Sequence, residues 1–374
     1  MITCDVLIVG GGPAGSSCAW ALSRAGLDVM VMDRAVFPRD KVCAGWITPQ
    51  VVAELDLDTE AYRQSRTFQT ITGFRTGLIG DAEAVDTRYG HPVSYAIRRC
   101  EFDHYLLERA GARLKLGTPI ATLRREQSYW IVNDAIKTPM LVGAGGHFCP
   151  VARLLNDSDR AEAGGSLIVA QEVEERVEPD AAATLAIDPE VPELYFSRDL
   201  KGYGWCLRKG DYVNVGLGRL DRQSLPKATA EFVAFLETRG RIPKRSWRWR
   251  GHAYLVSAAV HRRVVDAGVL LVGDAAGLAY PQSGEGIRPA IESGLLGAST
   301  ILDANGQYAR HRLDPYDVRL RARFGISAVS RALSRVIPSN PWPALGGALL
   351  RTRAFARHVV IDRWFLHAHE PPLV

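Results

Sequence analysis

Three glycines near the N-terminus have the spacing of a loop that holds the phosphates of a dinucleotide. Residues 4–15 read CDVLIVGGGPAG, an apolar run that leads into Gly10, Gly12 and Gly15. We expect Gly10 to form a tight turn, Gly12 to let the main chain approach a pyrophosphate, and Gly15 to let a helix pack on a strand. The N–H groups at the start of that helix would then face the pyrophosphate.

An acidic residue ends the next predicted strand. Asp33 lies 18 residues after Gly15, where a carboxylate can accept hydrogen bonds from the hydroxyls of an adenosine ribose. Pro13 and Ala14 at the start of the helix, and Arg34 after the acid, are further expected cofactor contacts. Strand, helix, second strand and acid follow one another in register, which favours a dinucleotide site over an ordinary glycine loop.

A second segment far downstream indicates which dinucleotide binds. Residues 268–277 read GVLLVGDAAG, and their four consecutive aliphatic residues predict a buried parallel strand. Asp274 at its end would hold the ribityl or pyrophosphate region of FAD. We expect a helix from about Gly284 to Leu302, whose N-terminus would stabilise negative charge on a reduced flavin. The other expected contacts in this segment are Gly273, Gly286 and Ile287.

A cysteine and several aromatic residues are the candidates for chemistry and substrate binding. Cys43, in an irregular loop over 35–50, is the candidate proton-relay or flavin-face residue, with an inert thiol as the alternative. Tyr203 and Trp205 lie at i and i+2 of a predicted strand and would form an aromatic wall, unless they are ordinary core residues. The remaining candidates are Ala44 for the cofactor, and Trp46 and Tyr280 for the substrate.

The pattern of elements predicts an α/β protein with two interleaved domains and a tail. We expect an FAD-binding domain from 1–50, 90–160 and 257–305, a mixed β-sheet substrate domain from 51–89 and 161–256, and a helical segment over 306–374. The expected strands are 166–177, 194–198, 204–208 and 212–217, and the expected helices include 99–112 and 227–239.

Several motifs together resemble one known family. They are, in order, Gly10-x-Gly12-x-x-Gly15, Lys41-Val42-Cys43-Ala44-Gly45, Tyr95-x-x-x-Arg99-x-x-Phe102-Asp103, Tyr203-x-Trp205, Gly210-Asp211-Tyr212-Val213-Asn214-Val215-Gly216-Leu217-Gly218, Gly273-Asp274-Ala275-Ala276-Gly277 and Gly284-Glu285-Gly286-Ile287. Over about residues 1–305 the chain resembles geranylgeranyl-reductase-like flavoproteins built on the para-hydroxybenzoate-hydroxylase plan. The resemblance implies a Rossmann-like FAD-binding domain of the glutathione-reductase-2 type and a flavin contact by Arg99. It also implies an enzyme that reduces carbon–carbon double bonds of an apolar, isoprenoid-like substrate.

Two departures from the family pattern concern the substrate and the electron donor. Residues 143–146 read GAGG where the family usually has an aspartate, which argues against a hydroxylase with ordinary NADPH docking. Residues 200–208 keep Tyr203 and Trp205 of the substrate signature and lack its prolines and phenylalanine. We therefore keep an FAD monooxygenase that uses a C4a-hydroperoxide as the alternative, with a flavin halogenase or a non-catalytic flavin or lipid carrier after it. The electron donor would be NAD(P)H or a reduced ferredoxin.

Composition sets the remaining expectations. The six cysteines show neither CxxC spacing nor metal spacing with histidines, so we expect no disulfide framework and no metal. Because the chain begins in its first predicted strand and lacks a long apolar run, we expect no signal peptide and a cytoplasmic location. The oligomeric state is left open.

The tail carries a distinct charge. Residues 306–374 hold 11 arginines and 4 acidic residues, and Arg351, Arg353, Arg357 and Arg363 alternate with apolar residues. The pattern is typical of a basic amphipathic helix, which would either pack on the substrate domain or touch the inner face of a membrane. Nucleic acid is not an expected partner, because no binding module accompanies the charge.

Overall fold

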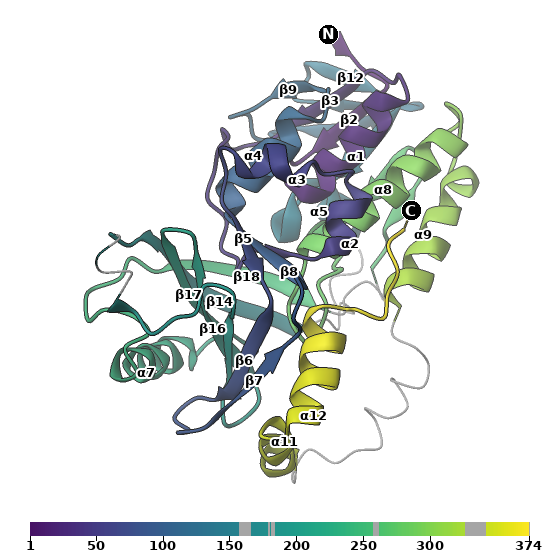
Figure 1. Cartoon of the computed structure of the whole chain (residues 1–374). Helices are drawn as coiled ribbons and strands as arrows, with labels where there is room; N and C mark the ends of the chain where they lie inside the picture. Colours follow the sequence, from purple (N-terminus) through teal and green to yellow (C-terminus); the bar gives the residue numbers. More distant parts are fainter. Residues whose placement is uncertain (157–165, 179, 181–183, 257–261, 326–341, 374) are drawn as a thin grey trace. The chain divides into compact units, whose positions relative to one another are not determined.

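The computed structural model describes residues 1–156, 166–178, 180, 184–256, 262–325 and 342–373. The chain divides into two compact units, each assembled from three segments. Unit 1 comprises Met1–Asp40, Cys100–Ser166 and Tyr254–Ser330, and unit 2 comprises Lys41–Arg99, Leu167–Ala253 and Arg331–Val374. Figure 1 follows the chain through both units by colour.

Unit 1 is built on a six-stranded sheet in the order β19-β20-β13-β2-β3-β9. Its strands are β2 (Val6–Val9), β3 (Val29–Met32), β9 (Arg113–Lys115), β13 (Met140–Gly143), β19 (Val265–Asp266) and β20 (Val269–Leu271). The strands from β9 to β20 pair in parallel, and their aliphatic side chains form the buried core of the unit. A small sheet adds β1 (Ile2–Thr3), β10 (Leu123–Glu126), β11 (Tyr129–Val132) and β12 (Ile136–Thr138).

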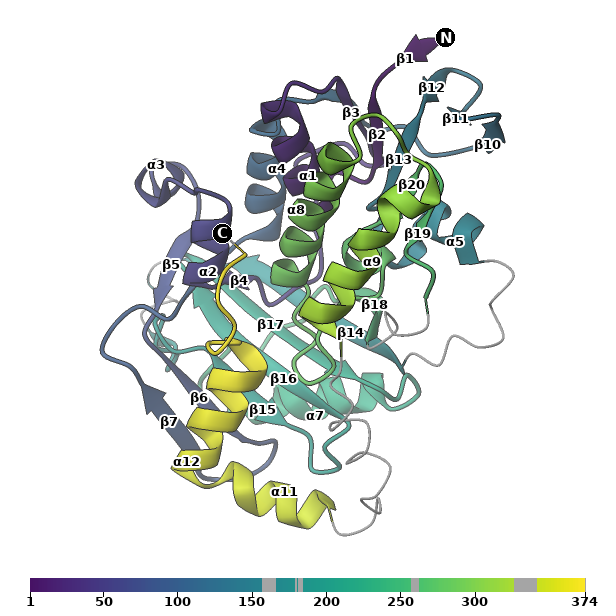
Figure 2. The same ribbon diagram turned by 90° about the vertical axis from the view of Figure 1, so that its right-hand side faces the viewer.

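Helices pack against one another beside this sheet. The helices and 3-10 turns of unit 1 are α1 (Pro13–Arg24), α4 (Arg99–Glu108), η1 (Gly146–Phe148), α5 (Pro150–Asn156), η4 (Gly273–Ala275), α8 (Ile287–Asp303) and α9 (Arg310–Phe324). Figures 1 and 2 both show α1 alongside α8 and α8 alongside α9. Gly294 makes the first of these contacts possible, because a Cβ at that position would lie 2.4 Å from the carbonyl oxygen of Ala14.

Unit 2 is built on a seven-stranded sheet in the order β18-β14-β17-β16-β15-β6-β7. Its strands are β6 (Gly73–Leu78), β7 (Ala84–Arg88), β14 (Ser166–Arg176), β15 (Glu193–Phe196), β16 (Gly202–Lys209), β17 (Tyr212–Arg219) and β18 (Arg250–Val256). A three-stranded sheet joins β4 (Trp46–Ile47), β5 (Phe68–Ile71) and β8 (Ser94–Ile97). The helices are α2 (Pro49–Glu54), α3 (Thr59–Arg63), α7 (Leu225–Thr238), α11 (Trp342–Leu350), α12 (Arg353–Phe355) and the π-helix η5 (Ala356–Phe365).

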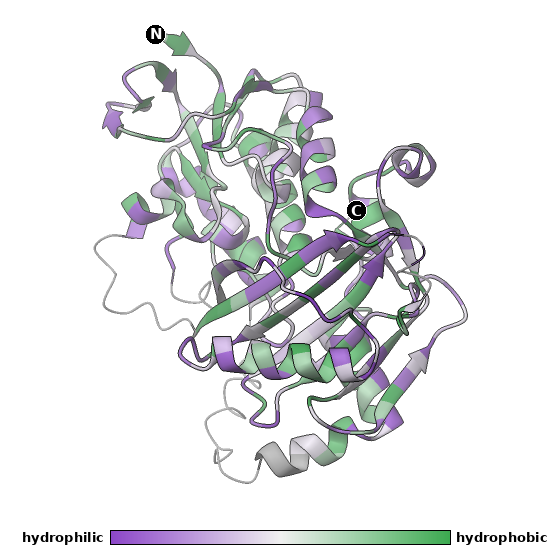
Figure 3. Ribbon diagram, turned by 90° about the vertical axis from the view of Figure 1, so that its left-hand side faces the viewer, coloured by the Kyte–Doolittle hydropathy of each residue, from purple (hydrophilic) through white to green (hydrophobic). Residues whose placement is uncertain are grey.

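One face of the large sheet is covered by a helix, and strand register shows which residues lie together on a face. Helix α7 covers one face, since Leu225, Thr229, Phe232 and Leu236 recur at the helical spacing and are buried. Figure 3 shows this helix across the sheet, with hydrophobic and hydrophilic residues along it. Register places Glu172 opposite Gly216, and Gly216 opposite Trp205, so these residues share a face of the sheet.

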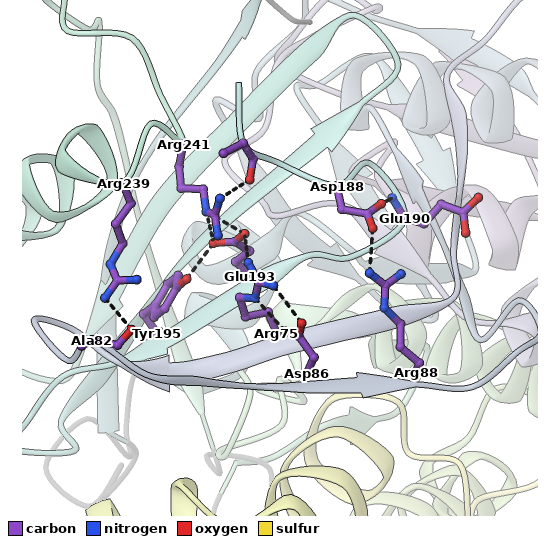
Figure 4. Close-up of polar contacts among 11 residues, drawn as sticks. Arg75, Ala82, Asp86, Arg88, Asp188, Glu190, Glu193, Tyr195, Arg239 and Arg241 are labelled. Carbon is purple, nitrogen blue, oxygen red and sulfur yellow. Dashed lines mark hydrogen bonds and ion pairs between the residues drawn. The ribbon is translucent and has the colours of Figure 1, made fainter. Parts of the chain in front are cut away.

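A buried ionic cluster lies at β15. Glu193 is 2% exposed, and its carboxylate binds Nε of Arg241 at 2.9 Å and Nη1 of Arg75 at 3.4 Å. The hydroxyl of Tyr195 donates to the same carboxylate at 2.7 Å, and Arg75 also binds Asp86. Figure 4 shows Arg75, Tyr195 and Arg241 around Glu193, with Asp86 bound to Arg75. The cluster ties β6, β7, β15 and the segment after α7 together.

The units differ in their limits from the domains expected above. Residues 41–50 and 90–99 belong to unit 2, because β4 and β8 pair with each other and β8 pairs with β5. The part of the tail up to residue 325 belongs to unit 1, where α9 packs on α8. The expected boundaries at 160 and 257 fall in 157–165 and 257–261, and part of the expected tail falls in 326–341; all three stretches lie outside the described residues.

Candidate functional site

The glycine turn of unit 1 follows β2 and precedes α1. Gly10 has φ of +116°, and a Cβ on Gly15 would lie 1.9 Å from the carbonyl oxygen of Gly10. The packing of the protein itself therefore requires glycine at these two positions. A Cβ on Gly12 would meet only the end of the Arg39 side chain, at 3.3 Å. Gly12 is thus the member of the motif whose missing side chain leaves room for a ligand.

The start of α1 suits an anion. No side chain caps the helix and its first turn holds no acidic residue, so the helix dipole and free N–H groups are available to a pyrophosphate. Pro13 and Ala14, two of the expected contacts, are the first residues of the helix and are buried. This arrangement fits the pyrophosphate of a dinucleotide.

Asp33 connects the end of β3 to the glycine turn. Its Oδ2 accepts a hydrogen bond from the N–H of Gly11 and its Oδ1 accepts one from the N–H of Ala35, both at 2.8 Å. A carboxylate has about four acceptor positions, so this side chain can hold the turn and still receive ribose hydroxyls. Arg34, the neighbouring expected contact, is exposed.

The second expected cofactor segment lies in the same unit. β20 pairs in parallel with β13, and Asp274 follows in η4. A Cβ on Gly286 would lie 3.3 Å from Oδ1 of Asp274, so Asp274 lies close to the start of α8. Gly273, Gly284 and Gly286 all precede this helix. The helix begins at Ile287 instead of the expected Gly284, because Gly284 has φ of +66° and cannot continue a right-handed helix.

Sequence reasoning missed a buried ion cluster in α8. Arg288 and Glu292 are 1% and 0% exposed, and Nε of Arg288 binds Oε1 of Glu292 at 2.7 Å. Arg323 of α9 binds the same carboxylate at 2.7 Å. The ion pair between α8 and α9 explains why α9 packs within unit 1. Tyr280, an expected substrate residue, is 8% exposed in this unit and packs edge to face on Phe324, with 6.3 Å between ring centroids.

Cys43 lies in unit 2, in a loop whose main chain is bound by buried side chains. The N–H of Cys43 donates to Oε2 of Glu172, and its carbonyl oxygen accepts from Nδ2 of Asn214 at 3.3 Å. The Cys43 side chain is partly exposed, as is Ala44, the next expected cofactor contact. Gly45 has φ of +69°, and a Cβ there would lie 2.7 Å from Nζ of Lys209.

A network of charged groups surrounds this loop. Nζ of Lys209 is buried and lies 2.7 Å from Oε2 of Glu174, which also accepts from Nδ2 of Asn214 at 3.0 Å. Burial opposes ionisation of Glu174, but Lys209, Asn214 and Arg98 outweigh it and hold the pKa of this carboxyl below its usual range. Burial, opposed by the Lys209 charge and assisted by the Glu174 charge, raises the pKa of Glu172 to about 8. The sequence offered one signal for these groups, acidic residues at i and i+2 of the strand expected over 166–177.

The expected substrate aromatics of unit 2 form one cluster. The ring of Tyr203 lies 6.0 Å from that of Trp205 and 5.2 Å from that of Phe365, and Trp46 lies 6.1 Å from Phe365. Tyr203 is partly exposed, whereas Trp46 and Trp205 are 6% and 5% exposed. Nε1 of Trp205 donates to Oδ1 of Asn214 at 2.7 Å. The aromatic cluster, defined as these four residues, is therefore joined to the Cys43 loop through Asn214.

Two neighbouring arginines at the start of α4 have distinct environments. Arg98 lies before the helix, binds Glu174 at 3.1 Å and stacks on Tyr212 at 3.6 Å. Arg99, the expected flavin contact, is the first residue of α4 and is 8% exposed. Arg98 therefore has an ion-pair partner in unit 2, and Arg99 is the more deeply buried of the two.

The C-terminal segment contributes apolar side chains to the core of unit 2. Leu350, Val360, Ile361 and Phe365 are buried there, as the packing alternative for the amphipathic pattern predicts. Its arginines remain exposed. Among the described residues, no helix has the length and apolar character that crossing a bilayer requires.

Known proteins share both the sequence pattern and the fold. The family model for FAD dependent oxidoreductases matches residues 5–82. Menaquinone reductase of Mycobacterium tuberculosis is 30% identical over 319 residues, which cover 80% of this chain and 76% of that protein. Digeranylgeranylglycerophospholipid reductase of Methanothrix thermoacetophila is 27% identical over 342 residues, or 86% and 84% of the two chains.

A solved structure extends the likeness to the whole chain. The crystal structure of a geranylgeranyl bacteriochlorophyll reductase-like protein from Thermoplasma acidophilum has a TM-score of 0.74 at 21% identity, covering 98% of this chain and 99% of that one. The glycine turn, Asp33 and the α8 segment, which are expected FAD contacts, all lie in unit 1. The chain belongs to the geranylgeranyl-reductase-like family of FAD-dependent oxidoreductases.

Proposed function

We propose that this FAD-dependent oxidoreductase reduces carbon–carbon double bonds of an apolar, isoprenoid-like substrate. The observation that supports the proposal is the hydrogen-bonded connection between the aromatic cluster and the Cys43 loop within unit 2. Two curated relatives are named as reductases of menaquinone and of a digeranylgeranyl lipid, molecules that carry isoprenoid chains. The proposal assigns FAD binding to unit 1 and substrate binding to unit 2.

Each group has a defined task in this proposal. Bound FAD supplies a hydride when it is reduced. The α1 N-terminus, Asp33 and Asp274 hold and orient the cofactor. The aromatic cluster binds the apolar chain and excludes water from it. The Cys43 thiol delivers a proton to the second carbon of the double bond, and Glu172 and Asn214 hold the main chain of that residue.

The partners of the reaction follow from the same chemistry. The electron donor is NAD(P)H or a reduced ferredoxin. The exposed arginines of the C-terminal segment face solvent and give the protein a basic surface for a brief contact with an anionic membrane, from which a lipid substrate would be drawn. We place the protein in the cytoplasm and at the inner membrane face.

An anaerobic reoxidation experiment tests the proposal. The FAD-loaded protein is photoreduced and mixed with a geranylgeranyl lipid or a menaquinone without oxygen, and flavin absorbance at 450 nm is followed. Reoxidation with loss of one double bond by mass spectrometry supports the reductase. Reoxidation only after oxygen is admitted, with a hydroxylated product, would replace it with the monooxygenase.

Variants separate the two roles assigned in unit 2. Cys43→Ser is expected to slow reoxidation by about 10²- to 10⁴-fold with FAD retained, whereas Cys100→Ser, a partly exposed cysteine in α4, serves as the matched control. Tyr203→Leu is expected to raise the substrate concentration required, because an apolar wall holds ground and transition states alike. Trp205→Ala is a less specific probe, since it also removes the donor to Asn214.

A further inference from the structure

The main chain of Cys43 is bound on both sides by side chains from one face of the large sheet. Glu172 of β14 accepts a hydrogen bond from the N–H of Cys43, and Nδ2 of Asn214 in β17 donates one to the Cys43 carbonyl oxygen. Both side chains are buried, at 6% and 0% exposure. A loop residue with a partly exposed side chain thus has both main-chain polar groups held by buried partners.

The register of the sheet brings these two partners together. Glu172 and Glu174 lie at i and i+2 of β14, and Glu174 pairs directly with Asn214 across to β17. Nδ2 of Asn214 donates to both Glu174 and Cys43, while Oδ1 accepts from Trp205. Asn214 therefore has its amide orientation set by three partners and cannot turn without losing them.

We propose that Glu172 is a positioning residue that fixes the Cys43 loop by accepting its main-chain N–H, with Asn214 fixing the carbonyl side. The inference rests on the proposed function in taking Cys43 as the reactive thiol. Glu172 acts through the main chain of Cys43 and not on the reacting atoms. Nothing in the family resemblance or in the motifs above pointed to this glutamate.

The protonation state of Glu172 determines the strength of this bond. The charged groups around it are Lys209 of β16, Glu174 of β14 and Arg99 of α4, and Arg98 binds Glu174. Lys41 of the same loop lies 2.6 Å from the ring Nε2 of His252 in β18. With a pKa of about 8, Glu172 is protonated at neutral pH. An ionised carboxylate binds an N–H more strongly than a neutral acid does, so the bond to the loop strengthens as pH rises through 8.

Amide exchange tests the positioning role without any substrate. Hydrogen exchange of the peptide that contains Cys43 is measured by mass spectrometry in the FAD-loaded protein. Glu172→Leu removes the acceptor and is expected to speed exchange at this amide about 10- to 100-fold, whereas Glu172→Gln keeps an acceptor oxygen and protects it. Glu175→Gln on the same strand, whose carboxylate binds Arg245 at 2.8 Å, is the control and leaves the amide protected. Equal protection in the wild-type and Glu172→Leu proteins would overturn the proposal.

The pH dependence tests the titration of Glu172 and does not depend on the leucine variant folding. Flavin reoxidation by the substrate is followed from pH 6 to 10. The wild-type rate is expected to change through a step near pH 8 that Glu172→Gln lacks, while Glu175→Gln keeps it. A step that persists in Glu172→Gln would assign the titration to another group and overturn this part. If no substrate reoxidises the flavin at all, the proposed function fails, yet the exchange experiment still decides the role of Glu172.

Discussion

Removing the carboxylate of Glu193 should destabilise unit 2 while leaving the flavin chemistry intact. Glu193→Ala leaves the buried Tyr195 hydroxyl without its acceptor and Arg241, 13% exposed at its side chain, without its ion pair. Burial and the neighbouring carboxylate raise the pKa of Tyr195, so this hydroxyl keeps its proton and needs an acceptor. Arg75 retains Asp86 as a partner and adds little to the cost. Breaking a buried pair on one side costs about 3–5 kcal/mol.

Thermal unfolding measures this cost. For a unit of this size each kcal/mol lowers Tm by roughly 2–4 °C, so Glu193→Ala should lower it by about 10 °C. Glu193→Gln keeps an acceptor for Tyr195, so its Tm should lie between those of Glu193→Ala and the wild type. Asp188→Ala is the matched control, because its ion pair with Arg88 is about half exposed and is worth roughly 0–1 kcal/mol. A shift in Glu193→Ala no larger than that of the control would refute the reasoning, and FAD content per folded molecule should stay unchanged in all three variants.

Two further predictions concern the cofactor. Gly12→Val should fold with a Tm near that of the apoprotein and lose its flavin absorbance. Gly15→Ala should instead lower Tm or soluble yield, because its Cβ would lie 1.9 Å from the Gly10 carbonyl oxygen. Wild-type FAD occupancy in Gly12→Val would contradict the assignment of the turn. Arg99→Ala should raise the Kd for FAD about 10- to 100-fold in flavin titrations, as expected for a charged hydrogen bond worth about 1.5–3 kcal/mol. The increase should exceed that of Arg98→Ala. A larger increase in Arg98→Ala would assign the contact to Arg98.

Local patterns were enough to predict the elements that carry the expected cofactor contacts. The spacing of Gly10, Gly12 and Gly15 and the apolar run before Asp274 depend on neighbours along the chain. The structure places Gly10 and Gly12 in the turn between β2 and α1, Gly15 in α1, and the apolar run on β20. Of the strands of unit 2, β14, β15, β16 and β17 were also expected within a few residues of their observed limits, whereas the strands of the 41–99 segment and β18 were not. Periodicity and turn residues act over a few positions, so they are visible in one sequence.

The contacts of Glu172 could not be predicted in the same way. Cys43 and Glu172 are 129 residues apart, and only the pairing of strands brings them together. The observed limits of the units differ from the expected domain limits for a similar reason, because β4 and β8 are distant along the chain and pair with each other. Trp46 was expected as a substrate contact, and Trp205 as part of an aromatic wall or of the core. The structure places both in a cluster with Phe365 of η5, a contact that no local pattern signals.

Asp33 has a consequence for how the protein acquires its cofactor. Because its carboxylate binds the N–H groups of Gly11 and Ala35, the chain itself keeps the glycine turn in shape before any nucleotide arrives. A preorganised turn loses much less conformational entropy on binding than a flexible loop would. Apoprotein stripped of flavin should therefore regain it by simple mixing, with uptake limited by encounter between the two molecules and not by folding of the turn.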